Sequence, residues 1–294
     1  METAGSQVDL CNAAQVCKLF EEALEANRST PGRKGSVVDL PDRGRLVVTG
    51  DLHDNRENFR KIVKLAELDR SADNHLVLHE VIHGPHMVNN LDLSYRMLAS
   101  VAELKLKYPN QVHLMLANHD LAQINGVGIL KHGMNVVEAF ESGLDYLFGD
   151  RGSDIHDLIA RFLKNLPLAV RGANGIFCCH SLPARRHLDD FDATVLDRTL
   201  SDHDLAGPSG SAHLMVWGRR FGQDVADRLA AGWGAEVFLM GHQKAEMGCE
   251  EVGRSMLIIN SDTSHGAAVV ADLSRKPNRD QLMEEMVPLA GVML

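Results

Sequence analysis

Short apolar runs alternate with longer amphipathic segments from residue 36 to about residue 272, and this alternation restricts the fold more than any other feature. The apolar runs predict strands at Arg45–Thr49, His75–Leu78, Val112–Leu116, Gly175–Cys179, Glu236–Met240, Met256–Asn260 and Ala267–Ala271. Segments 56–69, 90–107, 135–147, 153–165 and 220–231 lie between these runs and have helical spacing. Strands that alternate with helices are typical of a layered α/β fold.

Both ends of the chain differ from this pattern. Residues 8–26 predict a helix packed on the outside of the main domain, because apolar side chains recur at helical spacing. Residues 27–35 are polar and contain Pro and Gly, as a linker does. We therefore divide the chain into an N-terminal helix and linker (1–35), a main domain (36–275) and a C-terminal tail (276–294). The apolar end of the tail is a candidate docking or oligomer contact.

The composition limits the classes of partner. Hydrophobic residues make up 45% of the 294, enough for a sizeable core, and the formal net charge is −10. An acidic chain without a basic stripe is a poor match for nucleic acid, because phosphate backbones bind clustered Lys and Arg. The five cysteines lack metal-finger spacing, and neither a signal peptide nor an apolar run of ~20 residues is present. We expect a cytoplasmic protein without membrane contact.

Side chains of the kind that bind metals follow five of the expected strands. They are Asp51 and His53; His79, Glu80 and His83; Asn118, His119 and Asp120; His180; and His242. Ligands bind beyond the carboxyl ends of strands in open α/β sheets, so these side chains are expected at one edge. A single histidine after a strand is usually a turn or core residue, but five separate strand ends are hard to explain in that way. The histidines without such a context are expected at the surface or in the core: His75, His113, His132, His156, His187, His203 and His213.

In their order and spacing these motifs resemble the calcineurin-like metallophosphoesterases, and within them the protein serine/threonine phosphatases. GDLHDN with Asp51 and His53 is similar to GDxHG, LANHD with Asn118 and His119 to GNH(E/D), and MGHQ with His242 to the late GH element. LPLAVRGANGIFCCHSLPA resembles the phosphatase segment that ends in a histidine-bearing loop. The resemblance spans residues 45 to about 272. It implies a four-layer α/β/β/α sandwich with two mixed sheets and metals at the strand ends.

One motif departs from the family. Where the family has GDxxDRG after its second strand, this chain has His79-Glu80-Val81-Ile82-His83-Gly84-Pro85. Glu80 stands where the family has the Asp that bridges two metals. His83 replaces the Asp that orients the catalytic histidine, and Gly84 replaces an Arg that grips phosphate. The changes concern the mechanism more than the metal site.

The resemblance implies two divalent metal ions, Mn, Fe or Zn, with nitrogen and oxygen ligands. The expected ligands are Asp51 and His53 for the first ion, Glu80 for both, and Asn118, His180 and His242 for the second. Two such ions lower the pKa of a bound water, which attacks phosphorus in line, and they hold the phosphate oxygens. The expected reaction is hydrolysis of a phosphomonoester without a phosphoenzyme, on a small molecule or a phosphoprotein, including phosphoserine and phosphothreonine.

The substrate would meet further side chains. By the same resemblance His119 is the general acid, a role that suits the ordinary pKa of histidine. Because Gly84 replaces the family arginine, the candidates for a phosphate clamp are Arg56, Arg185, Arg186, Arg219 and Arg220. Among these, Arg56, Arg219 and Arg220 fit best, and His265 in SDTSH is placed to touch substrate.

Two alternatives remain open at this stage. One is a nucleotide phosphoesterase, acting on dinucleoside polyphosphates or cyclic nucleotides, although aromatic residues make up only 5% of the chain and offer no evident stacking platform. The other is a noncatalytic member that keeps the metal pocket for structure or partner binding, which the altered second motif supports. Assays with phosphopeptides and nucleotides in parallel distinguish a phosphomonoesterase from a nucleotide phosphoesterase. The variant Glu80→Asp distinguishes a catalytic site, which should change in rate or metal loading, from a noncatalytic one, which should change only in stability.

Overall fold

Two mixed β-sheets form the centre of the computed structural model, which describes residues 8–85, 87–131 and 133–294. The larger sheet has the order β1 (Arg33–Lys34), β2 (Val37–Leu40), β10 (Ala169–Gly172), β11 (Ile176–Cys179), β12 (Val237–Met240), β14 (Met256–Ile259) and β13 (Cys249–Val252). The smaller sheet has the order β16 (Met286–Pro288), β15 (Ala267–Asp272), β3 (Arg45–Asp51), β4 (His75–His79) and β7 (Val112–Leu114). Two hairpins add β5 (Met87–Val88) with β6 (Leu91–Asp92), and β8 (Leu130–Lys131) with β9 (Met134–Asn135).

The middle of each sheet is parallel. In the smaller sheet β3, β4 and β7 run in the same direction, and in the larger sheet β11, β12 and β14 do so. The carboxyl ends of these strands therefore lie at one edge of each sheet. A bridge between Asp51 and Asn260 joins the two sheets at that edge.

Apolar side chains between the sheets form one of two buried cores. Alternate residues of each strand point to opposite faces. Thus Ile176 and Cys178 of β11 join the core between the sheets, whereas Phe177 and Cys179 join the core beneath the helices. The adjacent cysteines are therefore buried thiols on the two faces of one strand.

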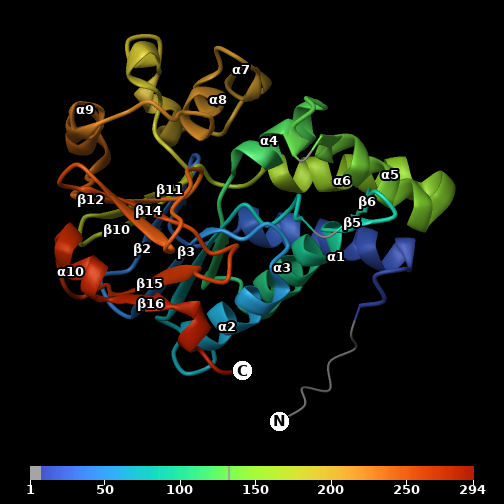
Figure 1. Cartoon of the computed structure of the whole chain (residues 1–294), viewed down its shortest axis with the longest axis horizontal. Coiled ribbons are helices and arrows are strands. Elements are labelled where there is room, and N and C mark those ends of the chain that lie inside the picture. The colour runs from blue at the N-terminus through green and yellow to red at the C-terminus, as the bar shows by residue number, and fades with distance from the viewer. Residues whose placement is uncertain (1–7, 86, 132) are drawn as a thin grey trace.

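Helices cover the outer faces of both sheets. The described helices are α1 (Ala13–Arg28), α2 (Arg56–Ala66), α3 (Tyr95–Lys107), α4 (Asn118–Asn125), α5 (Val136–Phe148), α6 (Gly152–Lys164), α7 (Asp202–Leu205), α8 (Ser211–Val216), α9 (Gln223–Trp233) and α10 (Arg279–Glu284), with short 3-10 turns at Gly149–Arg151, Arg185–His187, Ala193–Asp197 and Leu289–Gly291. Helices α2 and α3 pack on the smaller sheet. Trp233 of α9 stacks on Phe177 of the larger sheet, with ring centroids 5.1 Å apart. The result is the expected α/β class with two mixed sheets and helices outside (Figure 1).

The N-terminal helix packs on other helices rather than on a sheet. Helix α1 contacts α3 and α6, and these helices gather with α5 on the right of Figure 1. Phe20 of α1 meets Phe162 of α6 edge-on, with ring centroids 5.5 Å apart. This peripheral position agrees with the expectation for residues 8–26, although the helix begins at Ala13.

The C-terminal segment, expected as a tail, has structure of its own. Residues 279–284 form α10, and β16 (Met286–Pro288) pairs antiparallel with β15. Leu282 and Leu289 are buried. The segment therefore forms an edge of the smaller sheet.

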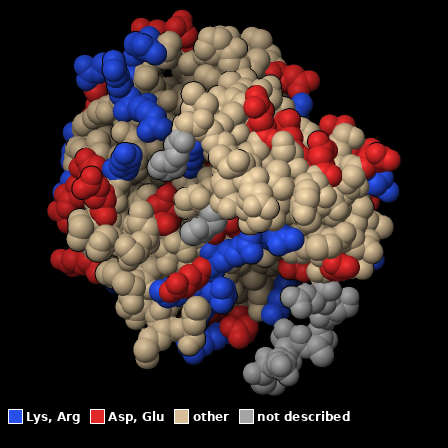
Figure 2. Space-filling model, turned by 45° about the vertical axis from the view of Figure 1, so that its right-hand side comes forward, with Lys and Arg blue, Asp and Glu red and all other residues tan. Residues whose placement is uncertain are grey.

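Charges are unevenly spread over the surface. Figure 2 shows basic side chains gathered at the upper left and along the lower middle of one face, although the chain is acidic. Of the helices in the described part of the chain, none is both long and apolar enough to cross a membrane. His132, expected at the surface or in the core, lies outside the described residues.

Candidate metal centre

The loops that follow β3, β4, β11 and β12 meet at one edge of the sheets. Asp51 ends β3, His79 ends β4, and His180 follows β11 directly. His242 comes two residues after β12. Asn118 is the first residue of α4. The parallel strands thus bring residues from distant parts of the sequence together.

At this edge several residues other than glycine have a positive φ, a backbone conformation that such residues rarely adopt. Glu80 has φ 34°, His53 has φ 40° and His242 has φ 67°, all in the left-handed region. The amides of Leu52 and His53 both donate to the carbonyl oxygen of Glu80, at 3.0 and 2.9 Å, and tie two loops together. Non-glycine residues in this region are costly and cluster at functional sites, where surrounding contacts hold them.

A glycine is required where the last loop crosses the first. A Cβ on Gly241 would lie 2.2 Å from Oδ1 of Asp51 and 3.3 Å from Nδ1 of His79. This close approach lets the amide of His242 donate to both carboxylate oxygens of Asp51, at 3.0 Å each. The sequence pair Gly241-His242 thereby orients Asp51 as well as supplying an imidazole.

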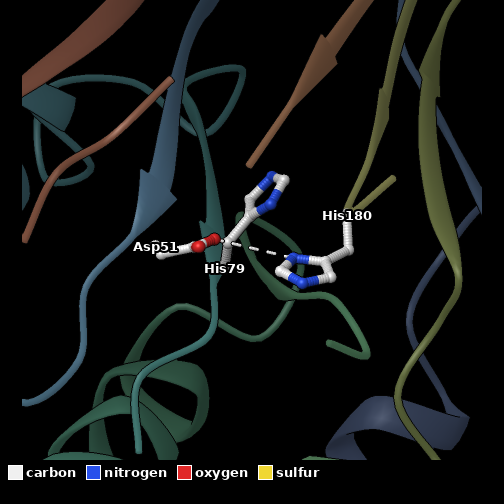
Figure 3. A group of neighbouring side chains, drawn as sticks. All are labelled: Asp51, His79 and His180. Atoms are coloured by element: carbon white, nitrogen blue, oxygen red, sulfur yellow. Dashed lines mark ion pairs between the residues drawn. The ribbon is translucent and has the colours of Figure 1, made fainter. Parts of the chain in front are cut away.

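One group of side chains surrounds Asn118. Its Oδ1 lies 2.8 Å from Nε2 of His180 and 2.8 Å from Nδ1 of His242. Nδ1 of His180 faces Oδ1 of Asp51 at 3.6 Å, as the dashed line in Figure 3 marks. His79 completes this group, since one atom each of Asp51, His79 and His180 lie within 4.8 Å of one another.

A second group surrounds Glu80. One atom each of His53, Glu80 and His119 lie within 4.8 Å of one another. Oε1 of Glu80 is 2.9 Å from Nε2 of His53, and Oε2 is 3.0 Å from Nε2 of His180. Glu80 therefore extends one oxygen to each group.

Burial and mutual charge set the ionisation of these groups. Burial and then the charge of Glu80 raise the pKa of Asp51 to about 6. Burial would also raise the pKa of Glu80, but His119, His53 and His180 lower it well below its usual value. Burial would lower the pKa of His53 and His180, yet Glu80 raises both. The negative charge of Glu80 thus favours positive charge, as a protonated histidine or a cation, at the centre of the site.

The unpaired atoms of the site match metal ligands. Among the described residues, no hydrogen-bond partner reaches either ring nitrogen of His79 or Nε2 of His242, although all are buried. Burial lowers the pKa of His79 to about 3 and of His242 to about 2, so both rings are neutral. Neutral imidazoles with free lone pairs beside two carboxylates suit divalent ions such as Mn, Fe or Zn. The residues therefore fit a metal-binding site.

The orientation of His53 is also fixed for such a role. Its Nδ1 is 3.0 Å from the carbonyl oxygen of Ile82, which can only accept, so Nδ1 carries the hydrogen. Nε2 is left to face Glu80. A ligating histidine usually donates its other N–H in this way.

His119 belongs to a chain of polar side chains that leads away from the site. Its Nδ1 lies 3.0 Å from Nδ1 of His83, whose Nε2 lies 2.9 Å from Oε1 of Gln123. Because the amide oxygen accepts from Nε2 of His83, Nδ1 of His83 is left to accept the N–H of His119. Burial lowers the pKa of His83 to about 3 and the pKa of His119 to about 2. Both rings are therefore neutral and do not repel each other. Asp120 points elsewhere and accepts from the amide of Ala117 at 2.9 Å.

A cavity of about 800 Å³ opens beside the two groups. Among the expected site residues it is lined by Asp51, His53, Glu80, Asn118, His119, Arg219 and His242, while His180 lies buried behind Asn118. Arg219 donates to the carbonyl oxygen of His242 at 3.1 Å. The remaining candidates do not line it: Arg56 contacts Asp54, Arg220 borders a neighbouring pocket, Arg185 contacts Asp224, Arg186 contacts His187 and His265 is exposed.

Lys131 is a cation of the cavity that sequence reasoning missed. It ends β8, and its Nζ lies 3.0 Å from Nε2 of His53 and 3.2 Å from the carbonyl oxygen of His83. No arginine fits at position 84, because a Cβ on Gly84 would lie 2.6 Å from the carbonyl oxygen of His53. No motif or strand end marks Lys131 in the sequence. His79 is not among the expected ligands, although its position at the end of β4 is the same signal that marks the others.

Comparisons with known proteins agree with this geometry. Residues 44–245, more than half of the chain, match the family model of the calcineurin-like phosphoesterases. A protein serine/threonine phosphatase from Saccharomyces cerevisiae, with similarity to human phosphatase PP5, aligns with a TM-score of 0.65 at 16% identity over 95% of this chain and 93% of its own. A cold-active protein-tyrosine phosphatase from a psychrophilic Shewanella aligns with a TM-score of 0.59 at 11% identity over 85% and 80%. Among curated proteins no relative matched.

Proposed function

The chain belongs to the calcineurin-like phosphoesterase family, whose members are metal-dependent hydrolases, and on that premise we propose that it hydrolyses phosphate monoesters with two divalent metal ions. The proposed substrates are phosphorylated small molecules or phosphoproteins, phosphoserine and phosphothreonine among them. The observation that carries the proposal is the position of Glu80, with one oxygen facing each of two buried ligand groups. A carboxylate in that place matches a pair of ions that share one ligand.

We assign the ligands from these two groups. By the family's motif order, Asp51, His53 and Glu80 would hold one ion, and Glu80, Asn118, His180 and His242 the other. Asp51 also lies beside His79 and His180 in the group around Asn118, so its carboxylate would face both ions, with His79 as a further nitrogen donor. Mn, Fe and Zn accept this mixture of imidazole, carboxylate and amide oxygen. When bound, such a pair supplies a nucleophile near neutral pH and neutralises phosphate charge.

Two cations of the chain would hold the phosphate from the open side of the cavity. Lys131 and Arg219 both line it, and neither forms an ion pair with a described carboxylate. An arginine presents two N–H groups to a phosphate, and a lysine acts as a point charge. Lys131 would thus take the role of the arginine that Gly84 excludes.

His119 would donate a proton to the leaving oxygen from Nε2. That atom lies 3.5 Å from Oε1 of Glu80. Because Nδ1 of His119 is tied to His83, the ring cannot turn away. A phosphate anion in the cavity favours the protonated ring and opposes the effect of burial on its pKa. General acids of this kind contribute about 10²- to 10⁴-fold to the rate.

Hydrolysis of an aryl phosphate by the purified protein tests the proposal. We expect turnover that requires added Mn²⁺ and that falls by at least about 100-fold in Asn118→Ala and in His119→Ala. Phosphopeptides and nucleotides, assayed in parallel, decide between the two substrate classes. A folded protein that binds Mn²⁺ but hydrolyses none of these substrates would be a noncatalytic member of the family.

A further inference from the structure

A second, smaller pocket of about 370 Å³ adjoins the metal cavity, and we call it the side pocket. Its polar and aromatic lining comes from Arg186, His187, His213, Trp217, Arg219 and Arg220. Arg219 lines both the side pocket and the metal cavity. The ring of Trp217 meets that of His242 edge-on, with centroids 6.3 Å apart. Trp217 of the side pocket therefore contacts His242, one of the proposed metal ligands.

The side pocket is positively charged and uncompensated. Among the described residues, no Asp or Glu lines it, and Arg186, Arg219 and Arg220 form no ion pair. Neighbouring arginines differ, since Arg185 pairs with Asp224 and Arg228 with Asp189. Three arginines without carboxylate partners are unexpected in a chain of net charge −10, because like charges held together repel. An anion would remove that repulsion.

Arg186, Arg219 and Arg220 are exposed, but the backbone that carries them is fixed. The amide of Arg185 donates to the carbonyl oxygen of Arg220 at 2.9 Å, which joins the two walls of the side pocket. Ser181 donates to the carbonyl oxygen of Gly218 at 2.5 Å, and a Cβ on Gly218 would lie 1.7 Å from the carbonyl oxygen of Leu182. The segment that carries Arg219 and Arg220 is thus fixed against the loop that carries His180. His213 stacks on Trp217 and supports its ring.

We propose that the side pocket binds a second anionic group of the substrate while the scissile phosphate occupies the metal cavity. The inference rests on the proposed function and narrows its substrate class to esters that carry a phosphate or carboxylate beside the group that is cleaved. Arg219 lies between the two anions, and its planar guanidinium can donate to both. The second anion can belong to a small bisphosphate or to an acidic or phosphorylated residue next to a phosphorylated one.

Steady-state hydrolysis with Mn²⁺ of matched substrate pairs tests this. One pair is a short alkanediol bisphosphate and its monophosphate, and the other is a phosphoserine peptide with Asp or Ala as the following residue. In the native protein we expect the second anion to lower KM about tenfold or more in at least one pair. If KM falls in only one pair, that pair shows whether the second anion belongs to a small bisphosphate or to a residue of a phosphopeptide. Equal KM values within both pairs overturn the proposal.

Arg186→Gln with Arg220→Gln is the decisive variant, because neither side chain lines the metal cavity. We expect it to raise KM for the doubly charged substrate to the value for its singly charged partner, with kcat and the KM for an aryl phosphate unchanged. Arg43→Gln, an exposed arginine paired with Asp73, is the matched control and should change nothing.

A binding measurement separates this inference from the proposed function. Calorimetric titration with a methylene-linked bisphosphonate, which resists hydrolysis, requires no turnover. If no substrate is hydrolysed but the bisphosphonate binds the native protein at least tenfold more tightly than the double variant, the side pocket stands and the proposed function fails. Hydrolysis with equal bisphosphonate binding in both proteins would contradict the side pocket alone.

Discussion

Glu80 faces both ligand groups, although the motif around it differs from that of the family. Its carboxylate reaches His53 with one oxygen and His180 with the other, from a backbone with φ 34°. The side chain is one methylene longer than the aspartate at this place in the family. The backbone conformation and the longer side chain together place the two oxygens between the ligand groups. The proposed bridge therefore depends on length as well as charge.

Shortening this side chain should uncouple the two groups. In Glu80→Asp the carboxylate moves back by about 1.5 Å, one C–C bond, and cannot reach both histidines from the same backbone. A misplacement of about 1 Å costs on the order of 100-fold in rate. We expect kcat to fall to that extent and the bound metal, measured by mass spectrometry, to fall below two ions per chain. Glu246→Asp, at an exposed site, serves as the control, and unaltered kinetics and metal content in Glu80→Asp would contradict the assignment.

Lys131 should act through its charge. Lys131→Met keeps much of the side-chain length and removes the cation that faces the cavity. We expect kcat/KM for an aryl phosphate to fall about 10- to 100-fold, because a charge-assisted hydrogen bond to phosphate is lost. Lys131→Arg should retain more of the activity than Lys131→Met. Equal losses in both variants would indicate a role in packing instead of phosphate binding.

His83 should act through His119. In His83→Ala the N–H of His119 and the amide oxygen of Gln123 both lose their partner. We expect kcat to fall about tenfold with KM nearly constant, and the pH profile of kcat to change, because nothing then fixes the His119 ring. A variant that loses stability but keeps its kcat and pH profile would show that His83 is only structural. His203→Ala, an exposed histidine, is the control.

The difference between what the sequence predicted and what it missed is clearest for Lys131 and His79. Asp51, His53, Asn118, His180 and His242 follow buried strands, and strand ends meet wherever the sheet forms. Lys131 lies in a two-residue hairpin strand without periodicity, so its approach to His53 depends on tertiary structure alone. The candidates Arg56, Arg220 and His265 had the right chemistry, but side-chain contacts draw Arg56 to Asp54 and the loops place the others outside the cavity.

At the scale of elements, uninterrupted apolar runs decide which strands the sequence reveals. The expected strands are short apolar runs, and the structure places them within one or two residues of expectation. The inner strands β2 and β10 were missed because a charged residue interrupts each run, and the two residues pair, Arg171 with Asp39 at 2.7 Å. The edge strand Cys249–Val252 was missed because it reads CEEV and has no fully buried residue. The helix expected at 90–107 begins only at Tyr95, because Leu91–Asp92 pairs with Met87–Val88 first.

The contact of α1 with the helical layer should contribute to the stability of the whole domain. Phe20 is fully buried against Phe162, so Phe20→Ala leaves a cavity and is expected to cost about 3–5 kcal/mol in the free energy of unfolding. Urea denaturation measures the loss, and Glu21→Ala on the exposed face of the same helix is the control. Since α1 lies away from the metal cavity, kcat of the folded variant should not change. An unfolding midpoint equal to that of the native protein would mean that α1 is not part of the cooperative unit.

At the scale of the whole molecule, the site joins both sheets. Asp51 and Glu80 follow strands of the smaller sheet, whereas His180 and His242 follow strands of the larger one. A metal ion held by ligands from both sheets would therefore bind only the folded arrangement. Binding of this kind adds to the free energy of unfolding, by about 4 kcal/mol at a free concentration 1,000 times the dissociation constant.

Removal of metal should accordingly lower the melting temperature. For a chain of this size about 1 kcal/mol corresponds to about 2 °C, so we expect Mn²⁺ to raise Tm by several degrees over the EDTA-treated protein. Differential scanning calorimetry measures the shift. In Asn118→Ala the shift should be smaller, because Oδ1 of Asn118 lies between His180 and His242 and its loss leaves one group a ligand short. Mg²⁺ at the same concentration should raise Tm less than Mn²⁺, since imidazole is a poor ligand for Mg²⁺. A Tm that is the same with EDTA and with Mn²⁺ would mean that the buried histidines and carboxylates hold each other without an ion, and the unpaired nitrogens of His79 and His242 would then require another explanation.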